Sequence, residues 1–168
     1  MEHYPDIMVD IETTSTSPDR GAILQIAAVK FNIYGEEVDP NFFDQCLTIP
    51  PSRRWDESTR EWWLSDGKRP LLESLIRRGQ PYREVLRNFR DWCGTDSRFW
   101  CRGLSFDFPF LQSYFTDFEV SNPFKFWQAM DSRTWIEAKG IDRDAFEFVG
   151  EKHNAIHDVL HEIKVLTR

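Results

Sequence analysis

The fold is decided by the stretch Ile7-Met8-Val9-Asp10-Ile11-Glu12-Thr13-Thr14, an apolar run that contains two acids. Its β-branched residues favour a strand. Residues two apart on a strand point to the same face, so Asp10 and Glu12 are expected to lie side by side. Two carboxylates on an otherwise apolar strand repel each other and lose hydration, which is costly unless something compensates. A solvated sheet face is the alternative explanation.

Two further strands are predicted downstream of this run. Residues 23–33 form a second apolar run, separated from the first by a Thr/Ser/Pro/Asp/Gly cluster that is typical of a turn, so the two runs predict a hairpin. Residues 43–49 predict a third strand, which Pro50 and Pro51 end. The chain therefore opens with three antiparallel strands.

The pattern then changes to helices. Apolar residues at helical spacing, with Pro near the starts and Gly after the ends, predict helices over residues 56–64, 70–78, 81–93, 106–115, 133–139 and 155–166. Short strands are predicted over residues 98–102 and 126–130. This order indicates a mixed sheet with helices packed on it, of α/β or α+β type.

Length and composition fit one domain over residues 1–168, with 40% apolar residues and a net charge of −7. No segment approaches the roughly 18–20 apolar residues of a membrane span. The segment Met1–Asp6 lacks the features of a secretory signal. The three cysteines are scattered along the chain, at Cys46, Cys93 and Cys101, which predicts reduced thiols in the core. Reduced thiols in turn indicate a cytoplasmic protein, located in the host cytoplasm if a phage encodes it. The negative charge argues against binding nucleic acid by bulk neutralisation, unless the carboxylates hold cations.

Two more acids and a histidine are informative only in combination with Asp10 and Glu12. Asp107 follows a Gly-Leu-Ser turn near a predicted helix start, where a helix-capping acid is equally expected. Asp158 lies in the last predicted helix. His153 is five residues before Asp158, and five residues of an α-helix correspond to a rotation of about 140°. His153 must therefore precede the helix to reach the same site as Asp158. A surface histidine is the alternative interpretation. Carboxylates suit hard divalent cations, and a histidine that titrates near neutrality suits a general base.

These residues resemble the motifs of the DnaQ-like, or DEDD, exonuclease superfamily. The Asp-x-Glu-Thr motif matches at Asp10–Thr13, the Phe-Asp motif at Phe106 and Asp107, and the His-x-Ala-x-x-Asp motif at His153–Asp158. The motifs stand in family order and cover the chain from residue 10 to residue 158. The resemblance implies an α/β, ribonuclease H-like fold with a mixed five-stranded sheet, whose first three strands are antiparallel and which helices flank.

The resemblance also implies a site with two Mg²⁺ or Mn²⁺ ions. Asp10, Glu12 and Asp158 would bind one ion, Asp10 would also touch the second, and Asp107 would help through water. His153 stands where the histidine branch has its general base, whereas Asn154 occupies the position of the tyrosine in the other branch. Gln25 departs from the Glu often found on the second strand of relatives, at a position that is not a metal ligand.

Residues 59–64 and 131–134 resemble more closely a phage and bacterial exoribonuclease and exodeoxyribonuclease group, near phage exonuclease A. The expected reaction is hydrolysis of single-stranded RNA or DNA from the 3′ end, which releases nucleoside 5′-monophosphates. An inactive nucleic-acid-binding module on the same fold is the alternative, although it would have no reason to keep every acid. The residues leave the choice of RNA or DNA open. They also leave the oligomeric state open, with a homodimer among the possibilities because dimers are common among relatives.

The substrate-binding residues expected from the sequence are Thr13, Thr14, Trp63 and Phe106, with Trp62 as the alternative to Trp63. Basic and aromatic residues alternate over residues 53–55 and 60–63, as on surfaces that bind single strands, although one Trp can equally anchor a helix in the core. His153, His157 and His161 recur every four residues but lack an HExxH pattern, so a zinc site is disfavoured.

Overall fold

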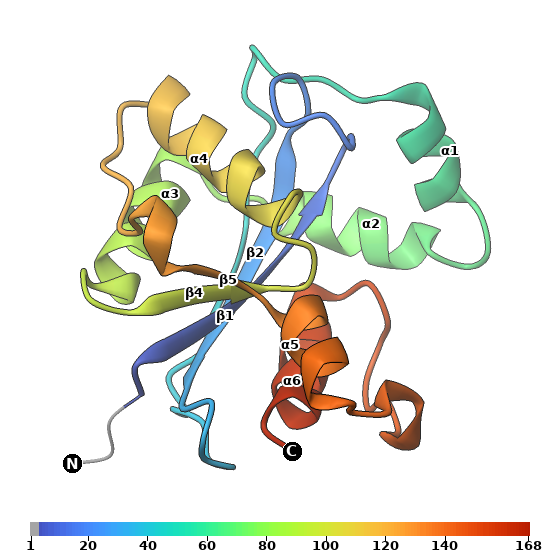
Figure 1. The fold of residues 1–168 in the computed structure, drawn as a ribbon. Helices are drawn as coiled ribbons and strands as arrows, with labels where there is room; N and C mark the ends of the chain where they lie inside the picture. Colours follow the sequence, from blue (N-terminus) through green and yellow to red (C-terminus); the bar gives the residue numbers. More distant parts are fainter. Residues whose placement is uncertain (1–3) are drawn as a thin grey trace.

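A computed structural model describes residues 4–168 (Figure 1). The first three residues of the segment Met1–Asp6, on which the prediction of no secretory signal partly rests, lie outside this range. Five strands form one sheet in the order β3-β2-β1-β4-β5. Their bounds are β1 Asp6–Thr13, β2 Ile23–Phe31, β3 Phe43–Cys46, β4 Arg98–Cys101 and β5 Ala129–Asp131. The helices are α1 Glu57–Leu64, α2 Arg69–Arg77, α3 Tyr82–Cys93, α4 Asp107–Asp117, α5 Ser132–Lys139 and α6 Ala155–Leu166, with short 3₁₀ turns η1 Phe126–Gln128 and η2 Arg143–Ala145.

The predicted topology is confirmed. β1 pairs antiparallel with β2, and β2 pairs antiparallel with β3, whereas β4 and β5 run parallel to β1. Two predicted strand boundaries differ from the structure by three residues. The strand predicted over residues 126–130 begins only at Ala129, because the Gln128 side chain accepts a hydrogen bond from the Lys125 backbone and closes a 3₁₀ turn. The strand predicted over residues 43–49 ends at Cys46.

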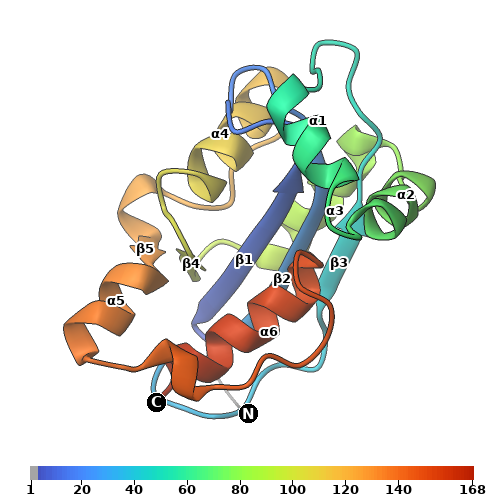
Figure 2. The ribbon, with the colours of Figure 1, turned by 90° about the vertical axis from the view of Figure 1, so that its right-hand side faces the viewer.

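The sheet separates two apolar layers, and β1 contributes to both. Ile7, Val9 and Ile11 pack in the core beneath α3 and α4, and Met8 packs on the other face beneath α6. Figure 2 shows α6 crossing β1 and β2 on this second face, with α1 beyond the far end of β1. Asp10 and Glu12 continue the face of Met8, so their carboxylates lie on the side of the sheet that α6 covers.

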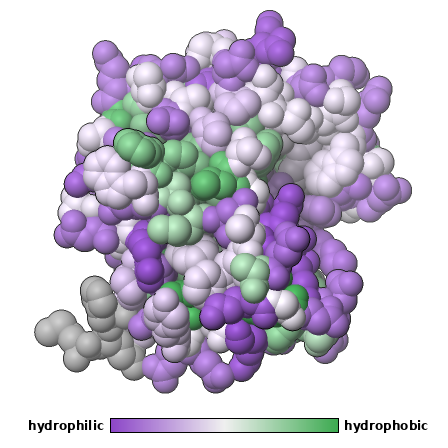
Figure 3. All heavy atoms as spheres, viewed as in Figure 1, coloured by the Kyte–Doolittle hydropathy of each residue, from purple (hydrophilic) through white to green (hydrophobic). Residues whose placement is uncertain are grey.

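The three cysteines are buried, reduced core residues, as predicted. Within residues 4–168, no helix is long and apolar enough to cross a membrane. Figure 3 shows hydrophilic side chains over much of the face seen in Figure 1, with an apolar patch over α4 and the region beside it.

A buried acid that the sequence did not single out ties the start of β1 to its neighbours. The Asp6 carboxylate accepts hydrogen bonds from Arg98 Nε at 2.7 Å and from Trp100 Nε1 at 2.7 Å, both on β4. It also accepts the backbone N–H of Ile33 at 3.0 Å, beyond the end of β2. One carboxylate therefore holds three segments together at the end of the sheet away from Glu12.

We expect the substitution Asp6→Ala to lower the free energy of unfolding by about 3 kcal/mol, because it leaves the buried N–H groups of Trp100 and Ile33 without an acceptor. Urea denaturation measures the change. Asp91→Ala is the control, since Asp91 is exposed and forms a surface salt bridge with neighbouring Arg90, so little change is expected. Equal, small effects of both substitutions would contradict the anchoring role of Asp6.

Candidate active site

Asp10, Glu12, Asp107 and Asp158, here called the acid cluster, meet near the C-terminal end of β1. β4 pairs with β1 only from Asp6 to Met8, so the pairing of these two strands ends before β1 reaches its acids. Asp107, the first residue of α4, occupies the gap, where its Oδ1 accepts the backbone N–H of Ile11 at 3.2 Å. This bond fixes Asp107 beside Asp10 and Glu12, across 96 residues of sequence.

The start of α6 is fixed by Gln25, a fully buried residue on β2 that pairs with Glu12 in register. Gln25 Oε1 accepts the backbone N–H of Ala155 at 3.1 Å. Gln25 Nε2 donates to Asn154 Oδ1 at 3.1 Å and to Asp44 Oδ1 at 2.8 Å. The amide therefore positions the first turn of α6, from which Asp158 faces β1. Sequence analysis missed this role, and the only signal for it is a glutamine inside an apolar strand.

His153 lies before the first turn of α6, as predicted from its spacing of five residues from Asp158. Its backbone has a φ of 67°, which is unusual for a residue other than glycine. Its ring packs edge-on against Trp62 of α1, with the ring centroids 4.9 Å apart. One ligand atom each of Glu12, His153 and Asp158 lie within 4.8 Å of one another. Residues from β1 and from the start of α6 thus converge at one place.

Burial and mutual repulsion disturb the ionisation of the acid cluster. Burial raises the pKa of Asp10 well above its ordinary value, and the charges of Asp107, Glu12 and Asp158 raise it further. The same causes raise the pKa of Glu12. Burial raises the pKa of Asp107 to about 8 and that of Asp158 to about 6. Such a cluster is unfavourable when every carboxylate is charged, so a nearby positive charge would stabilise it.

The donor set fits divalent cations. The acid cluster offers carboxylate oxygens, the ligands that Mg²⁺ and Mn²⁺ prefer, and burial followed by repulsion from the neighbouring acids raises the pKa values of Asp10 and Glu12. Glu12 and Asp158 are the acids brought closest to His153. The histidines of the disfavoured zinc pattern do not converge, because His157 Nδ1 accepts the Glu151 backbone N–H at 2.9 Å and His161 packs on Phe148.

Two cavities adjoin the acid cluster. The Trp cleft, of about 370 Å³, is lined by residues that include Glu12, Thr13, Thr59, Trp62, Trp63 and Phe106. The arginine cleft, of about 250 Å³, is lined by residues that include Asp10, Arg102, Arg143, His153, Asp158 and Glu162. The site is therefore open on one apolar, aromatic side and on one basic side.

The predicted substrate-binding residues occupy different positions around the Trp cleft. Thr13, Trp63 and Phe106 line it, but the Trp63 side chain is almost wholly buried and its Nε1 donates to Thr13 O at 3.0 Å. Trp63 is 1% exposed and Trp62 is 41% exposed, so Trp62 presents more surface to a ligand. Thr14 is buried, and its hydroxyl donates to Arg54 O at 2.8 Å and accepts from Ala22 N at 2.8 Å. Substrate contacts by these residues stay predictions.

The basic and aromatic segment at residues 53–55 is partly structural. The Arg53 guanidinium is buried, donates to Gly21 O at 3.1 Å and pairs with Asp117 at 2.7 Å. It also stacks over the Tyr114 ring at 4.7 Å. Arg53 therefore joins the turn after β1 to α4.

The raised pKa values predict that the cation-free protein loses stability as pH rises. The folded pKa values of Asp107 and Asp158, about 8 and about 6, exceed the ordinary value of 3.8, so the folded state binds more protons than the unfolded state between these limits. The stabilisation from these two groups is therefore lost as pH rises through about 6 and then about 8. We expect the melting temperature in EDTA to fall by several degrees between about pH 5.5 and pH 8, since 1 kcal/mol corresponds to roughly 2–4 °C.

Differential scanning calorimetry measures this slope. Addition of Mg²⁺ or Mn²⁺ should restore the loss, most strongly at the higher pH. The substitution Asp107→Asn should flatten the slope, because it removes the group with the pKa of about 8. A wild-type slope equal to that of Asp107→Asn would contradict the electrostatic description of the cluster.

Comparisons with known proteins agree with this geometry. A family model described as a 3′-5′ exoribonuclease Rv2179c-like domain matches residues 5–168. The exodeoxyribonuclease of Enterobacteria phage T4 is 25% identical over 201 aligned positions, which cover 96% of this chain and 87% of the phage protein.

Solved structures show the same fold at low identity. Exonuclease I superposes with a TM-score of 0.71 and 12% identity, over 95% of this chain; the chain spans only 40% of that protein. The nuclease domain of 3′hExo, a DEDDh family member solved with rAMP, has a TM-score of 0.67 and 15% identity, over 98% of this chain and 91% of that one. Pop2p of S. pombe, solved with Mg²⁺ and Mn²⁺, has a TM-score of 0.69 and 12% identity, over 98% of this chain and 82% of that one. These likenesses confirm the predicted ribonuclease H-like, α/β fold.

Proposed function

Because the chain belongs to the 3′-5′ exoribonuclease Rv2179c-like domain family, we propose that it is a divalent-cation-dependent exonuclease that removes nucleotides from the 3′ end of single strands. The observation that carries the proposal is the convergence of the acid cluster and His153 from three segments of the chain, namely β1, the start of α4 and the start of α6. That Pop2p was solved with Mg²⁺ and Mn²⁺ supports the choice of cation.

In this proposal Asp10, Glu12 and Asp158 hold one cation, Asp10 also contacts a second, and Asp107 completes the set through water. Bound Mg²⁺ or Mn²⁺ would supply positive charge against the phosphodiester and make water more acidic. The protein keeps these acids together without the cations by burying them against β1 and α6. The raised pKa values of Asp10 and Glu12 are then a consequence of holding the acids together in the absence of bound cations.

His153 is proposed as the general base. Its pKa is lowered by burial and by the positive charges of Lys68 and Lys152, so the imidazole is neutral and can accept a proton near pH 7. It would take the proton of a water molecule whose oxygen attacks the last phosphorus atom. The bond from phosphorus to the 3′ oxygen of the preceding nucleotide then breaks. A nucleoside 5′-monophosphate leaves, and the shortened strand keeps a 3′ hydroxyl.

The Trp cleft is proposed to hold the terminal nucleoside. It adjoins Glu12 and combines the exposed ring of Trp62 with Phe106, and aromatic surfaces of this kind stack on bases without sequence preference. A cleft of about 370 Å³ that takes one terminal base favours single-stranded or frayed ends.

Release of mononucleotides tests the activity. With Mg²⁺ or Mn²⁺, a 5′-labelled single strand should shorten one nucleotide at a time, and Asp10→Ala or Asp158→Ala should reduce turnover to background, because each removes a cation ligand. The exposed acid Glu73 on α2 offers the control Glu73→Gln, which should leave the rate unchanged. Paired RNA and DNA oligomers should be used, since the family description names an exoribonuclease and the phage relative an exodeoxyribonuclease. Retained turnover in either alanine variant would contradict the assignment.

The role of His153 needs a separate measurement. His153→Ala should slow single-turnover hydrolysis by roughly 10²–10⁴-fold, the usual contribution of a general base. Isothermal titration should find Mn²⁺ affinity nearly unchanged, because His153 is proposed to act on water and not as a required ligand. A large loss of Mn²⁺ affinity would instead make His153 a ligand, and an unchanged rate would exclude it as the base.

A further inference from the structure

The arginine cleft contains a charge arrangement that the proposed reaction does not use. Glu162 of α6 lines this cleft together with Asp10 and Asp158, and its side chain is almost wholly buried. Arg143 Nη2 donates to Glu162 Oε2 at 3.0 Å, and Arg102 Nη1 lies 3.6 Å from the same oxygen. Ser132 Oγ donates to the other carboxylate oxygen at 2.6 Å. Glu162 therefore holds two arginines from different segments beside the acid cluster.

Neutralising Glu162 does not account for both arginines. One guanidinium balances one carboxylate, so Glu162, Arg102 and Arg143 together carry a surplus of one positive charge, which lies beside the carboxylates of Asp10 and Asp158 in the same cleft. The side chains of Arg102 and Arg143 are 38% and 34% exposed, so they remain accessible while Glu162 fixes their positions. A positive charge fixed in this way, in a protein with a net charge of −7, indicates a place for an anion.

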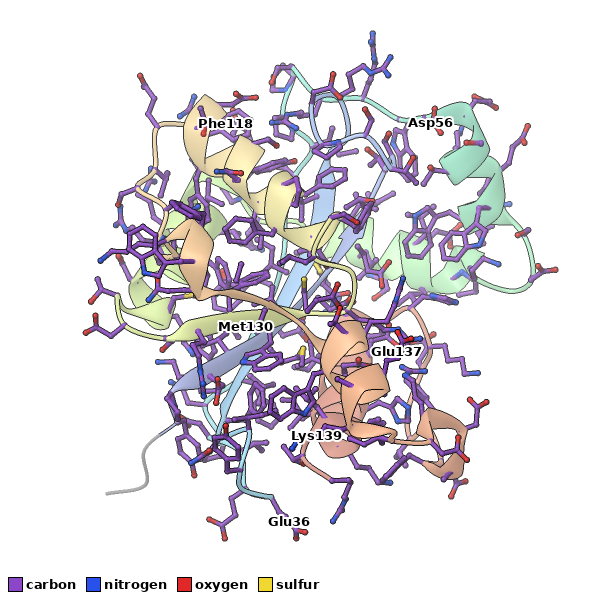
Figure 4. All side chains as sticks on the ribbon, viewed as in Figure 1. Glu36, Asp56, Phe118, Met130, Glu137 and Lys139 are labelled. Carbon is purple, nitrogen blue, oxygen red and sulfur yellow. The ribbon has the colours of Figure 1, made fainter. Side chains whose placement is uncertain are left out.

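The basic surface continues away from the acid cluster. A second cavity of about 250 Å³ shares Arg102, Arg143 and Glu162 with the arginine cleft, and Arg133 and Glu137 of α5 line its other side. Glu137 is labelled on α5 in Figure 4, below Met130 of β5. The Trp cleft, the acid cluster, the arginine cleft and this second cavity therefore follow one another across the protein surface. A strand whose 3′ end occupies the Trp cleft would continue over the arginines.

We propose that Arg102 and Arg143 bind the backbone phosphate immediately 5′ of the scissile linkage. This inference rests on the proposed function, and it adds a subsite for a second phosphate of the nucleic acid strand. Planar guanidinium groups suit a phosphate because each can donate two N–H groups to its oxygens. Arg102 is the stronger candidate for direct contact because it is the farther of the two from Glu162.

The test compares substrates that differ only in that phosphate. A dinucleotide with a free 5′ hydroxyl has the scissile linkage alone, whereas a trinucleotide has one linkage more. A third substrate is the trinucleotide with an uncharged methylphosphonate at the additional linkage. For the wild-type protein we expect the methylphosphonate to raise KM about tenfold, the loss expected for a charge-assisted contact. This arm needs no variant and so does not depend on whether a variant folds.

Protein variants, tested on the same three substrates, complete the comparison. Arg102→Gln should raise KM for the normal trinucleotide about as much as the methylphosphonate does for the wild-type protein. In this variant, the methylphosphonate should raise KM no further. KM for the dinucleotide should not change. Arg143→Gln should act in the same direction, and its melting curve shows whether Glu162 tolerates the loss. Arg90→Gln, on α3 behind the other face of the sheet, makes the same charge change and should alter none of these values.

The outcomes separate the two proposals. If the wild-type protein releases no mononucleotide from any substrate, the proposed function fails. If it cleaves all three substrates but the methylphosphonate leaves KM unchanged, or Arg102→Gln raises KM equally for the dinucleotide, then the exonuclease stands and the second phosphate subsite is overturned.

Discussion

Repulsion among the four carboxylates of the acid cluster is the constraint on which the rest of the site depends. Burial on the α6 side of the sheet and mutual charge raise the pKa of Asp10 and Glu12. Neutral contacts hold the cluster together: the Ile11 backbone fixes Asp107, and the Gln25 amide fixes the first turn of α6. Within residues 4–168, neither Asp10 nor Glu12 forms a salt bridge with a lysine or arginine, which suits the proposed binding of divalent cations.

The surroundings of the cluster differ on its two sides, and the difference has a physical meaning for a strand. On the side of α1, Trp62 and Phe106 offer aromatic surface, which suits a base. On the side of α6, Arg102 and Arg143 offer positive charge, which suits phosphate. A nucleic acid presents both kinds of surface along its length, so an asymmetric site can define which end of the strand enters. Such local positive charge can act on a phosphate even in a protein whose net charge is negative.

Much of the fold could be predicted from local patterns. The alternation in β1 placed Asp10 and Glu12 on one face, and the helices with Pro or Gly at their ends lie where they were expected. The failures have two causes. The 3₁₀ turn at Phe126 depends on a local side-chain contact of Gln128 with the Lys125 backbone. The roles of Asp6 and Gln25 depend on partners more than 20 and more than 100 residues away. Propensity and periodicity contain no information on such partners.

The sequence by itself determined the family motifs, the strand that carries the first two acids, and the antiparallel start of the sheet, because these depend on residue type and short-range spacing. Only the tertiary structure decided that β4 leaves β1 early enough to admit Asp107, that Trp63 is buried while Trp62 is exposed, and that Glu162 gathers two arginines beside the site. Each of these results comes from packing between segments far apart in the chain, where burial and hydrogen-bond partners, and not local sequence, set the position of a side chain.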